Sequence, residues 1–132
     1  MRANGTFEIQ LTPQTPDGKY EDALLGRMTF DKQFQGDLTG SSTGQMLSAM
    51  TAIKGSAGYV AIERVTGTLN GRSGSFVLQH NALMSGGEHQ LSVAVVPDSG
   101  TGSLSGIRGK FDIRIENRNH YYEFEYELPA EA

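Results

Sequence analysis

The stretch YVAIERVTGTLNGRSGSFVLQHNALM, residues 59–84, decides the fold of this chain. Apolar and polar residues alternate along it on both sides of Asn70 and Gly71. An Asn-Gly pair between alternating runs is a strong signal for a β-hairpin. We therefore expect antiparallel strands at 59–69 and 73–84, joined by a turn at 70–73.

The same period of two recurs along most of the chain, and no long helical pattern interrupts it. Six further strands are expected at about 6–12, at 24–35, from a turn at 36–37 to about 51, and at 88–96, 110–117 and 120–128. A loop with two prolines at 12–19 separates the first two. Eight antiparallel strands with short connections hide their apolar faces and their edges best in a closed β-barrel. The alternative arrangement is a two-sheet sandwich.

Length and composition favour one domain over residues 1–132, with a frayed tail at about 129–132. Seventeen glycines suit a protein with many turns, and the lack of cysteine excludes disulfides and thiolate chemistry. The net charge of −4 argues against binding to nucleic acid. Neither a signal peptide nor a membrane span is visible, so we expect a cytoplasmic protein. The three histidines lack metal-ligand spacing, and no metal or cofactor is expected.

A glycine-rich segment, VVPDSGTGSLSGIRGKFDI at 95–113, has the composition of a phosphate-binding loop but not its spacing. Its G-x-G-x-x-x-G spacing misses the dinucleotide fingerprint by one residue, and an extended segment follows where a helix is needed. The other phosphate motif needs a glycine at Leu104. We instead expect a barrel corner in which Leu104 and Ile107 plug one end from a short helical turn.

Two polar residues interrupt the apolar faces of the hairpin. Glu63 shares a side with Tyr59, Ala61, Val65 and Leu69, and His80 shares one with Phe76, Leu78, Ala82 and Met84. A four-residue loop would place Glu63 opposite His80, and a two-residue loop would place the two on a diagonal. Either register brings together a buried carboxylate and an imidazole. Glu63 could orient His80 as an acid or base that acts on a ligand. Alternatively, the pair could be a core hydrogen bond that only fixes the strand register.

Other candidates have plainer explanations. We expect Lys32 to lie at a strand end, where its ammonium group reaches water. The alternative is that this ammonium group binds an anionic head group. Tyr122, Phe124 and Tyr126 share one face of the last strand and favour core packing over a stacking platform. Four methionines could give an adaptable apolar lining or ordinary packing; they are Met28, Met46, Met50 and Met84.

The second half of the chain is similar to a bacterial family of unknown function. The resemblance lies in these residues: Glu63, Gly67, Gly71, Gly74-Ser75-Phe76, His80, Val96-Pro97, Ser99-Gly100-Thr101-Gly102, Leu104, Gly106-Ile107 and Gly109. Members of that family resemble plant allene oxide cyclase in fold, which implies a small lipocalin-like barrel of eight antiparallel strands. No cyclase catalytic set can be carried over residue by residue, and likeness of fold does not carry function.

We expect a module that binds a small, largely apolar ligand in the barrel lumen. The candidate lining residues are Tyr59, Glu63, Phe76, Leu78, His80, Tyr122 and Phe124. One alternative is an isomerase or cyclase acting in the lumen through Glu63 and His80, and the residues leave open whether the chain is an enzyme. Another is a structural protein, a homo-oligomer (dimer or trimer) formed through the outer sheet face.

Overall fold

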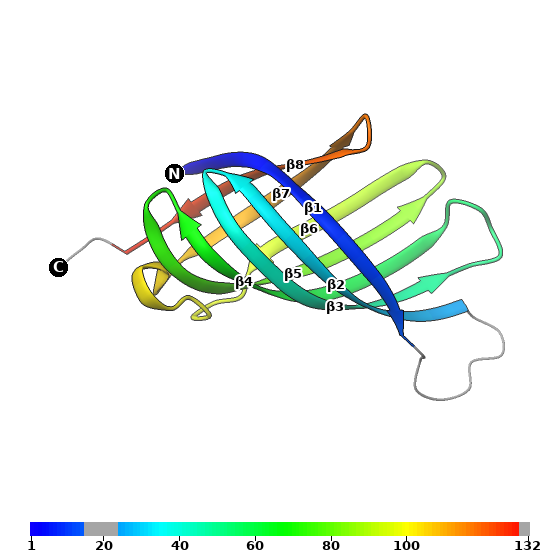
Figure 1. The fold of residues 1–132 in the computed structure, drawn as a ribbon. Coiled ribbons are helices and arrows are strands. Elements are labelled where there is room, and N and C mark those ends of the chain that lie inside the picture. The colour runs from blue at the N-terminus through cyan, green and yellow to red at the C-terminus, as the bar shows by residue number, and fades with distance from the viewer. Residues whose placement is uncertain (15–23, 130–132) are drawn as a thin grey trace.

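The chain folds into one closed barrel of eight antiparallel strands (Figure 1). The computed structural model describes residues 1–14 and 24–129. The strands are β1 (Arg2–Gln14), β2 (Leu24–Gly36), β3 (Leu38–Met50), β4 (Ala57–Leu69), β5 (Arg72–Ser85), β6 (Glu88–Val95), β7 (Arg108–Glu116) and β8 (Asn119–Glu127). A short 3-10 helix, η1 (Gly102–Leu104), lies between β6 and β7. The expected barrel is confirmed. Part of the expected loop at 12–19, and of the expected tail at 129–132, lies outside the described residues.

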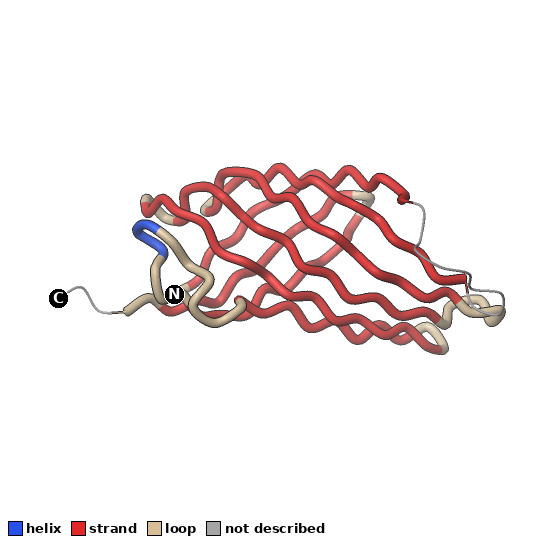
Figure 2. Tube along the Cα trace, turned by 90° about the horizontal axis from the view of Figure 1, so that it is seen from below, coloured by secondary structure: helices blue, strands red, loops and turns tan. Residues whose placement is uncertain are grey.

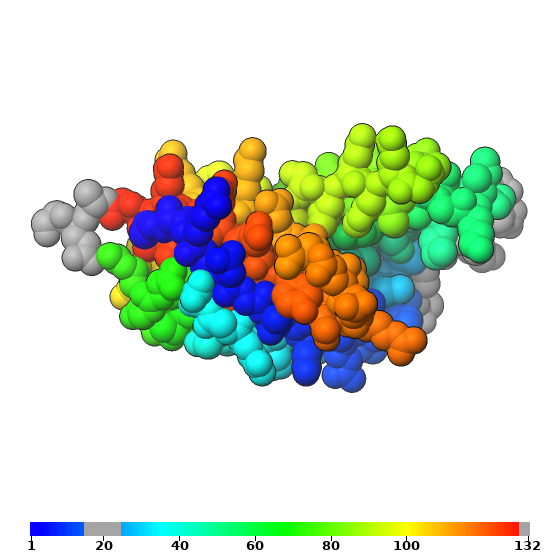
Figure 3. Space-filling view, turned by 90° about the horizontal axis from the view of Figure 1, so that it is seen from above, coloured from blue at the N-terminus to red at the C-terminus, as the bar shows by residue number. Residues whose placement is uncertain are grey.

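Pairing of the first strand with the last closes the sheet. Ala3 lies opposite Phe124 and Gly5 lies opposite Tyr122 in an antiparallel ladder. Figure 3 shows β1, in blue, running beside the orange and red of β8. The two-sheet sandwich is thereby excluded, because a closed sheet leaves neither of these strands as a free edge.

The β4–β5 hairpin has the shorter of the two loops considered from the sequence. Leu69 pairs with Arg72, so that only Asn70 and Gly71 form the turn. Both have positive φ angles, 46° and 85°, as a two-residue turn of this hand requires. The resulting register pairs Glu63 with Leu78 and pairs His80 with Ala61.

The glycine-rich segment closes one end of the barrel, at the same end as the N-terminus (Figure 2). Leu104 and Ile107 are fully buried there, as expected from the sequence. The Thr101 N–H donates to the Ser75 carbonyl at 2.8 Å, and the Ser75 N–H donates to Oγ1 of Thr101 at 3.0 Å. Gly74 permits this approach, because a Cβ at that position would collide with the Thr101 carbonyl. The loop is therefore a plug, built around a close contact between backbones.

Aromatic side chains fill the plugged half of the barrel. Phe76 stacks on Phe124 with ring centroids 5.6 Å apart, and Phe111 stacks on Tyr122 at 5.3 Å. All four are at most 1% exposed. Further along the interior, away from η1, the packing changes from aromatic rings to a buried group of polar side chains.

Candidate functional site

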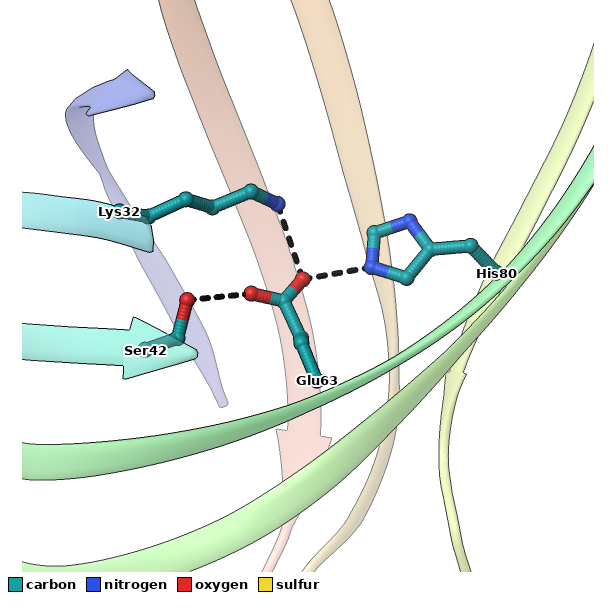
Figure 4. A network of polar contacts seen from close by, with 4 residues as sticks. All are labelled: Lys32, Ser42, Glu63 and His80. Atoms are coloured by element: carbon teal, nitrogen blue, oxygen red, sulfur yellow. Dashed lines mark hydrogen bonds and ion pairs between the residues drawn. The ribbon is translucent and has the colours of Figure 1, made fainter. Parts of the chain in front are cut away.

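The carboxylate of Glu63 is the centre of a buried polar network in the barrel interior (Figure 4). Its Oε1 atom lies 2.9 Å from Nζ of Lys32 and 2.5 Å from Nε2 of His80. Its Oε2 atom accepts a hydrogen bond of 2.6 Å from Oγ of Ser42. Each of the four side chains comes from a different strand, and the four strands, β2 to β5, are consecutive neighbours in the sheet.

The alternation of the strands explains why these side chains meet. Lys32 on β2 lies directly opposite Ser42 on β3, and both point inward. Glu63 on β4 lies opposite Gly44, the next inward position of β3. Because Gly44 has no side chain, the phenyl ring of Phe30 lies over it, where a Cβ would collide with the ring.

Burial and charge fix the ionisation of Glu63. Its burial raises the pKa of the carboxyl, but the hydrogen bond from His80, the charge of Lys32, the charge that His80 carries when protonated and the hydrogen bond from Ser42 together outweigh burial and lower the pKa to about 2. Glu63 is therefore a carboxylate at neutral pH, and the Lys32 ammonium balances its charge.

The ammonium of Lys32 also lies among aromatic rings. Its Nζ is 4.8 Å from the ring centroid of Phe7 and 5.3 Å from that of Phe30. Cation–π contacts of this kind partly replace the water that a buried ammonium loses. The sequence-based placement of Lys32 at a solvated strand end is wrong, because its side chain is only 3% exposed and lies in the middle of β2.

The interior next to the network, on the side away from the plug, has small side chains on β4 and β5 and the buried ring of Phe30 on β2. Ala61 and Ala82 are buried beside Gly44 on the neighbouring strands. Beyond them, the residues in phase with the inward positions are only half-buried; they are Met28, Met46, Tyr59, Met84 and Leu91. Lys32 and His80 keep 3% and 5% of their side-chain surface, whereas Glu63 keeps none.

The residues expected to line a ligand site separate into two groups. Glu63 and His80 meet in the network. Leu78 is buried between Glu63 and the plugged half of the barrel, and Tyr59 is half-buried near the other end. The three aromatic residues Phe76, Tyr122 and Phe124 are buried in the aromatic core of the plugged half. The core role expected for the last strand is confirmed. Among the four methionines, Met50 cannot line the interior, because it is 60% exposed.

Sequence reasoning missed Ser42 and misjudged Lys32. Ser42 lies in a weakly patterned stretch, LTGSSTG at 38–44, in which nothing distinguishes it from the turn-type serines beside it. Lys32 did carry a signal, because it is in phase with Phe30 and Phe34 on either side of it in the same strand. A lysine among inward-facing apolar residues needs a counter-ion. Glu63 is a carboxylate that the sequence already predicts on a buried strand face.

Among the described residues there is no cluster of metal ligands and no helix that could span a membrane. Within residues 1–14 and 24–129, no three His, Asp or Glu side chains gather as metal ligands would. None of these residues forms a helix long and apolar enough to cross a membrane. The cytoplasmic location expected from the sequence stays a prediction.

Comparisons with known proteins match this chain to proteins described as of unknown function. The family model described as "Protein of unknown function (DUF3224)" matches residues 3–126. The crystal structure of a protein of unknown function from the same family, from Shewanella oneidensis MR-1, is 51% identical, with a TM-score of 0.93 and 98% of each chain covered. No curated protein matches the chain. The resemblance to allene oxide cyclase is not addressed by these matches and stays a prediction.

Proposed function

Since this chain belongs to the DUF3224 family, whose function is unknown, its role has to be inferred from its own interior, and we propose that it binds a small, largely apolar molecule with one oxygen-bearing end inside the barrel. The bound molecule lies on the side of the polar network away from the plug. Its polar end meets Lys32 and His80, and its apolar body lies along the half-buried inward positions. This is the kind of ligand that an eight-stranded barrel can hold.

One observation carries the proposal: a charged, hydrogen-bonded network lies between a densely packed half of the interior and a half with small or half-buried side chains. A buried ion pair is weak evidence for stability, because apolar residues of similar volume are often as stable or more so. Polar groups that converge on an otherwise apolar pocket are typical of ligand sites, where they fix the ligand's orientation. Ala61 and Ala82 are the small buried positions beside these groups, and the ring of Phe30 covers Gly44.

The donors of the network suit an oxygen on the ligand. A lysine ammonium has three N–H donors, and one of those on Lys32 is directed at Glu63. The remaining donors lie among apolar rings, where a ligand carbonyl or carboxylate oxygen is a better partner than any ring. Such a ligand would be held by its oxygen at the network and by burial of its chain beyond it.

The test uses methyl heptyl ketone and nonanoate as probes, with binding measured by isothermal titration calorimetry and by the shift of the thermal unfolding midpoint. Ala82→Phe fills the interior beside the network, and Asn81→Phe places the same ring on the outer face as a matched control. We expect wild type and Asn81→Phe to bind at least one probe and Ala82→Phe to bind neither. Ala61→Leu, a smaller filling change, serves the same purpose if Ala82→Phe does not fold. Equal binding by wild type and both filled variants, or no binding by wild type, would overturn the proposal.

A second candidate, a homodimer formed through the outer face, is favoured by a separate observation. We define the outer patch as Leu47, Val60 and Ile62, which are 59%, 50% and 49% exposed on β3 and β4. Contiguous exposed apolar surface of this kind often marks an interface. The patch lines a groove that also contains Asp31 and Arg64, placed on either side of Thr43 in one row across three strands.

The charges beside the outer patch fit a second copy of this chain. A two-fold axis through the groove would bring Asp31 of each copy to Arg64 of the other, while the apolar residues cover one another. A patch with both signs of charge at matched positions is self-complementary, as an isologous interface requires. The oligomer expected from the sequence is therefore proposed to be a dimer built on this face.

A further inference from the structure

We infer that His80 and Lys32 together transfer a proton next to the carbonyl group of a bound ketone or aldehyde. This inference rests on the proposed function, because the substrate must first enter the barrel. It goes beyond binding by giving each nitrogen a separate chemical role: the imidazole removes a proton, and the ammonium stabilises the negative charge that develops on oxygen. Glu63 positions both and does not touch the substrate.

The tautomer of His80 follows from its contact with Glu63. An ionised carboxylate accepts hydrogen bonds and donates none, so the proton in this 2.5 Å contact belongs to Nε2 of His80. In the neutral ring the lone pair is then on Nδ1. Figure 4 shows that Nδ1 lies on the edge of the ring that is turned away from Glu63. The basic nitrogen is therefore directed away from the carboxylate, and the ring retains a small accessible surface.

The carboxylate also stabilises the ring after it has accepted a proton. When Nδ1 takes a proton the imidazolium carries a positive charge, and Glu63 lies in contact with its other nitrogen. In a water-poor interior this charge pairing is worth more than it would be in solvent. The arrangement is that of a base oriented by a carboxylate, which is the pattern general-base catalysis requires.

Lys32 supplies the complementary electrophile. Its Nζ contacts the same carboxylate oxygen as His80 Nε2, so the ammonium and the imidazole lie within a few ångströms of each other. An ammonium that keeps its proton can donate to a ketone oxygen and hold the enolate that forms there. No other lysine or arginine among the described residues contacts Glu63 in the way Lys32 does.

The step balances without an outside reactant. His80 Nδ1 takes a proton from the carbon next to the carbonyl, and the electron pair of that C–H bond moves to form the enolate, whose oxygen Lys32 holds. With a β,γ-unsaturated ketone, the proton returns from His80 to the γ carbon. The carbonyl re-forms, and the double bond has moved into conjugation with it. Neither oxidation nor a leaving group is involved, so the reaction is an isomerisation.

The experiment uses the β,γ-unsaturated analogue of methyl heptyl ketone, with the conjugated product followed by its ultraviolet absorbance in ordinary and deuterated water. We expect wild type to form the product with little solvent deuterium at the γ carbon, because His80 carries the α proton to that carbon, whereas isomerisation through solvent would place deuterium there. His80→Gln should lower kcat about 100-fold or more, the usual contribution of a general base. His89→Gln, which changes an exposed histidine on β6, is the matched control and should keep the wild-type rate.

Variants of Lys32 and Glu63 separate chemistry from folding. Lys32→Arg should keep part of the activity and Lys32→Met should lose it. Glu63→Gln should lower kcat with little change in KM, since it disturbs the base without touching the ketone. If His80→Gln does not fold, the charge-free double variant Lys32→Met/Glu63→Gln replaces it and should also be inactive.

The outcomes separate the inference from the proposed function. Binding of the saturated ketone without isomerisation of the unsaturated one overturns the inference and leaves the binding site intact. A wild-type rate that His80→Gln does not change also overturns it. Binding of nonanoate but not of the ketone to wild type overturns only the inference, and absence of binding of both probes overturns the inference and the proposed function together.

Discussion

Glu63 and His80 meet across a diagonal of the β4–β5 ladder rather than as a direct pair. Glu63 lies opposite Leu78 and His80 lies opposite Ala61, yet the two side chains make a 2.5 Å contact. Diagonal neighbours on one face of a sheet are within reach of long side chains. The offset places the small side chain of Ala61 opposite His80, and the ring of Phe30 lies edge-on to the imidazole with centroids 6.4 Å apart.

Removal of the Glu63 charge should destabilise the fold. In Glu63→Gln, the buried ammonium of Lys32 loses its counter-ion, and breaking a buried pair in this way costs about 3 kcal/mol. Urea unfolding should show this loss, while Glu123→Gln, which changes an exposed glutamate on β8, should show almost none. In the double variant Lys32→Met/Glu63→Gln both charges are gone, and we expect most of the stability to return. A double variant as unstable as the sum of its single changes would contradict this account.

Stability should fall at low pH because of the same carboxylate. Its pKa is about 2 in the folded protein and 4.5 ordinarily, so the unfolded chain binds a proton more readily than the folded one. The stabilisation is present above about pH 4.5 and is lost as the pH falls toward 2, amounting to about 3 kcal/mol at 1.36 kcal/mol per pKa unit. Urea unfolding of wild type and of Lys32→Met/Glu63→Gln at several pH values should show a difference in slope over this window. Parallel curves would show that Glu63 does not have this pKa.

The hydroxyl group of Tyr122 should stabilise the closure of the barrel. It accepts a hydrogen bond of 2.9 Å from the buried N–H of Leu38 and lies 3.1 Å from the carbonyls of Leu38 and Gln35. Tyr122→Phe leaves that N–H without its partner, which costs about 1–3 kcal/mol. Chemical denaturation measures the loss, and Tyr121→Phe, on the other face of β8, is the control. Equal stability of the two variants would rule out this role.

The outer patch should control oligomeric state. Val60→Glu places a charge in the proposed interface and should yield monomers by size-exclusion chromatography with light scattering, whereas Thr66→Glu, on the same face of β4 but outside the patch, should not. Asp31→Arg and Arg64→Asp should each be monomeric alone and should form a heterodimer when mixed, because each repels itself and attracts the other. A monomeric wild type, or Val60→Glu that remains dimeric, argues against the interface.

The sequence alone determined the strands, and it favoured a closed barrel over the two-sheet sandwich that the pairing of β1 with β8 excludes. Alternation of apolar and polar residues is a local property, and Asn70-Gly71 specifies a tight turn through the backbone conformations that it permits. The plug formed by Leu104 and Ile107 was also predictable, since two apolar residues within a glycine-rich corner have only the barrel end in which to be buried. Glu63 and His80 were found because a polar residue on an apolar face is visible within its own strand.

Only the tertiary structure decided which groups complete the site. Lys32 and Ser42 reach Glu63 from two other strands, thirty-one and twenty-one positions away along the chain. Such contacts depend on the register of each ladder and on how far the sheet curls before it closes, and a one-residue slip in either would direct the side chains elsewhere. The pattern of a strand records which residues face inward, but the partners they meet inside are set by the geometry of the whole barrel.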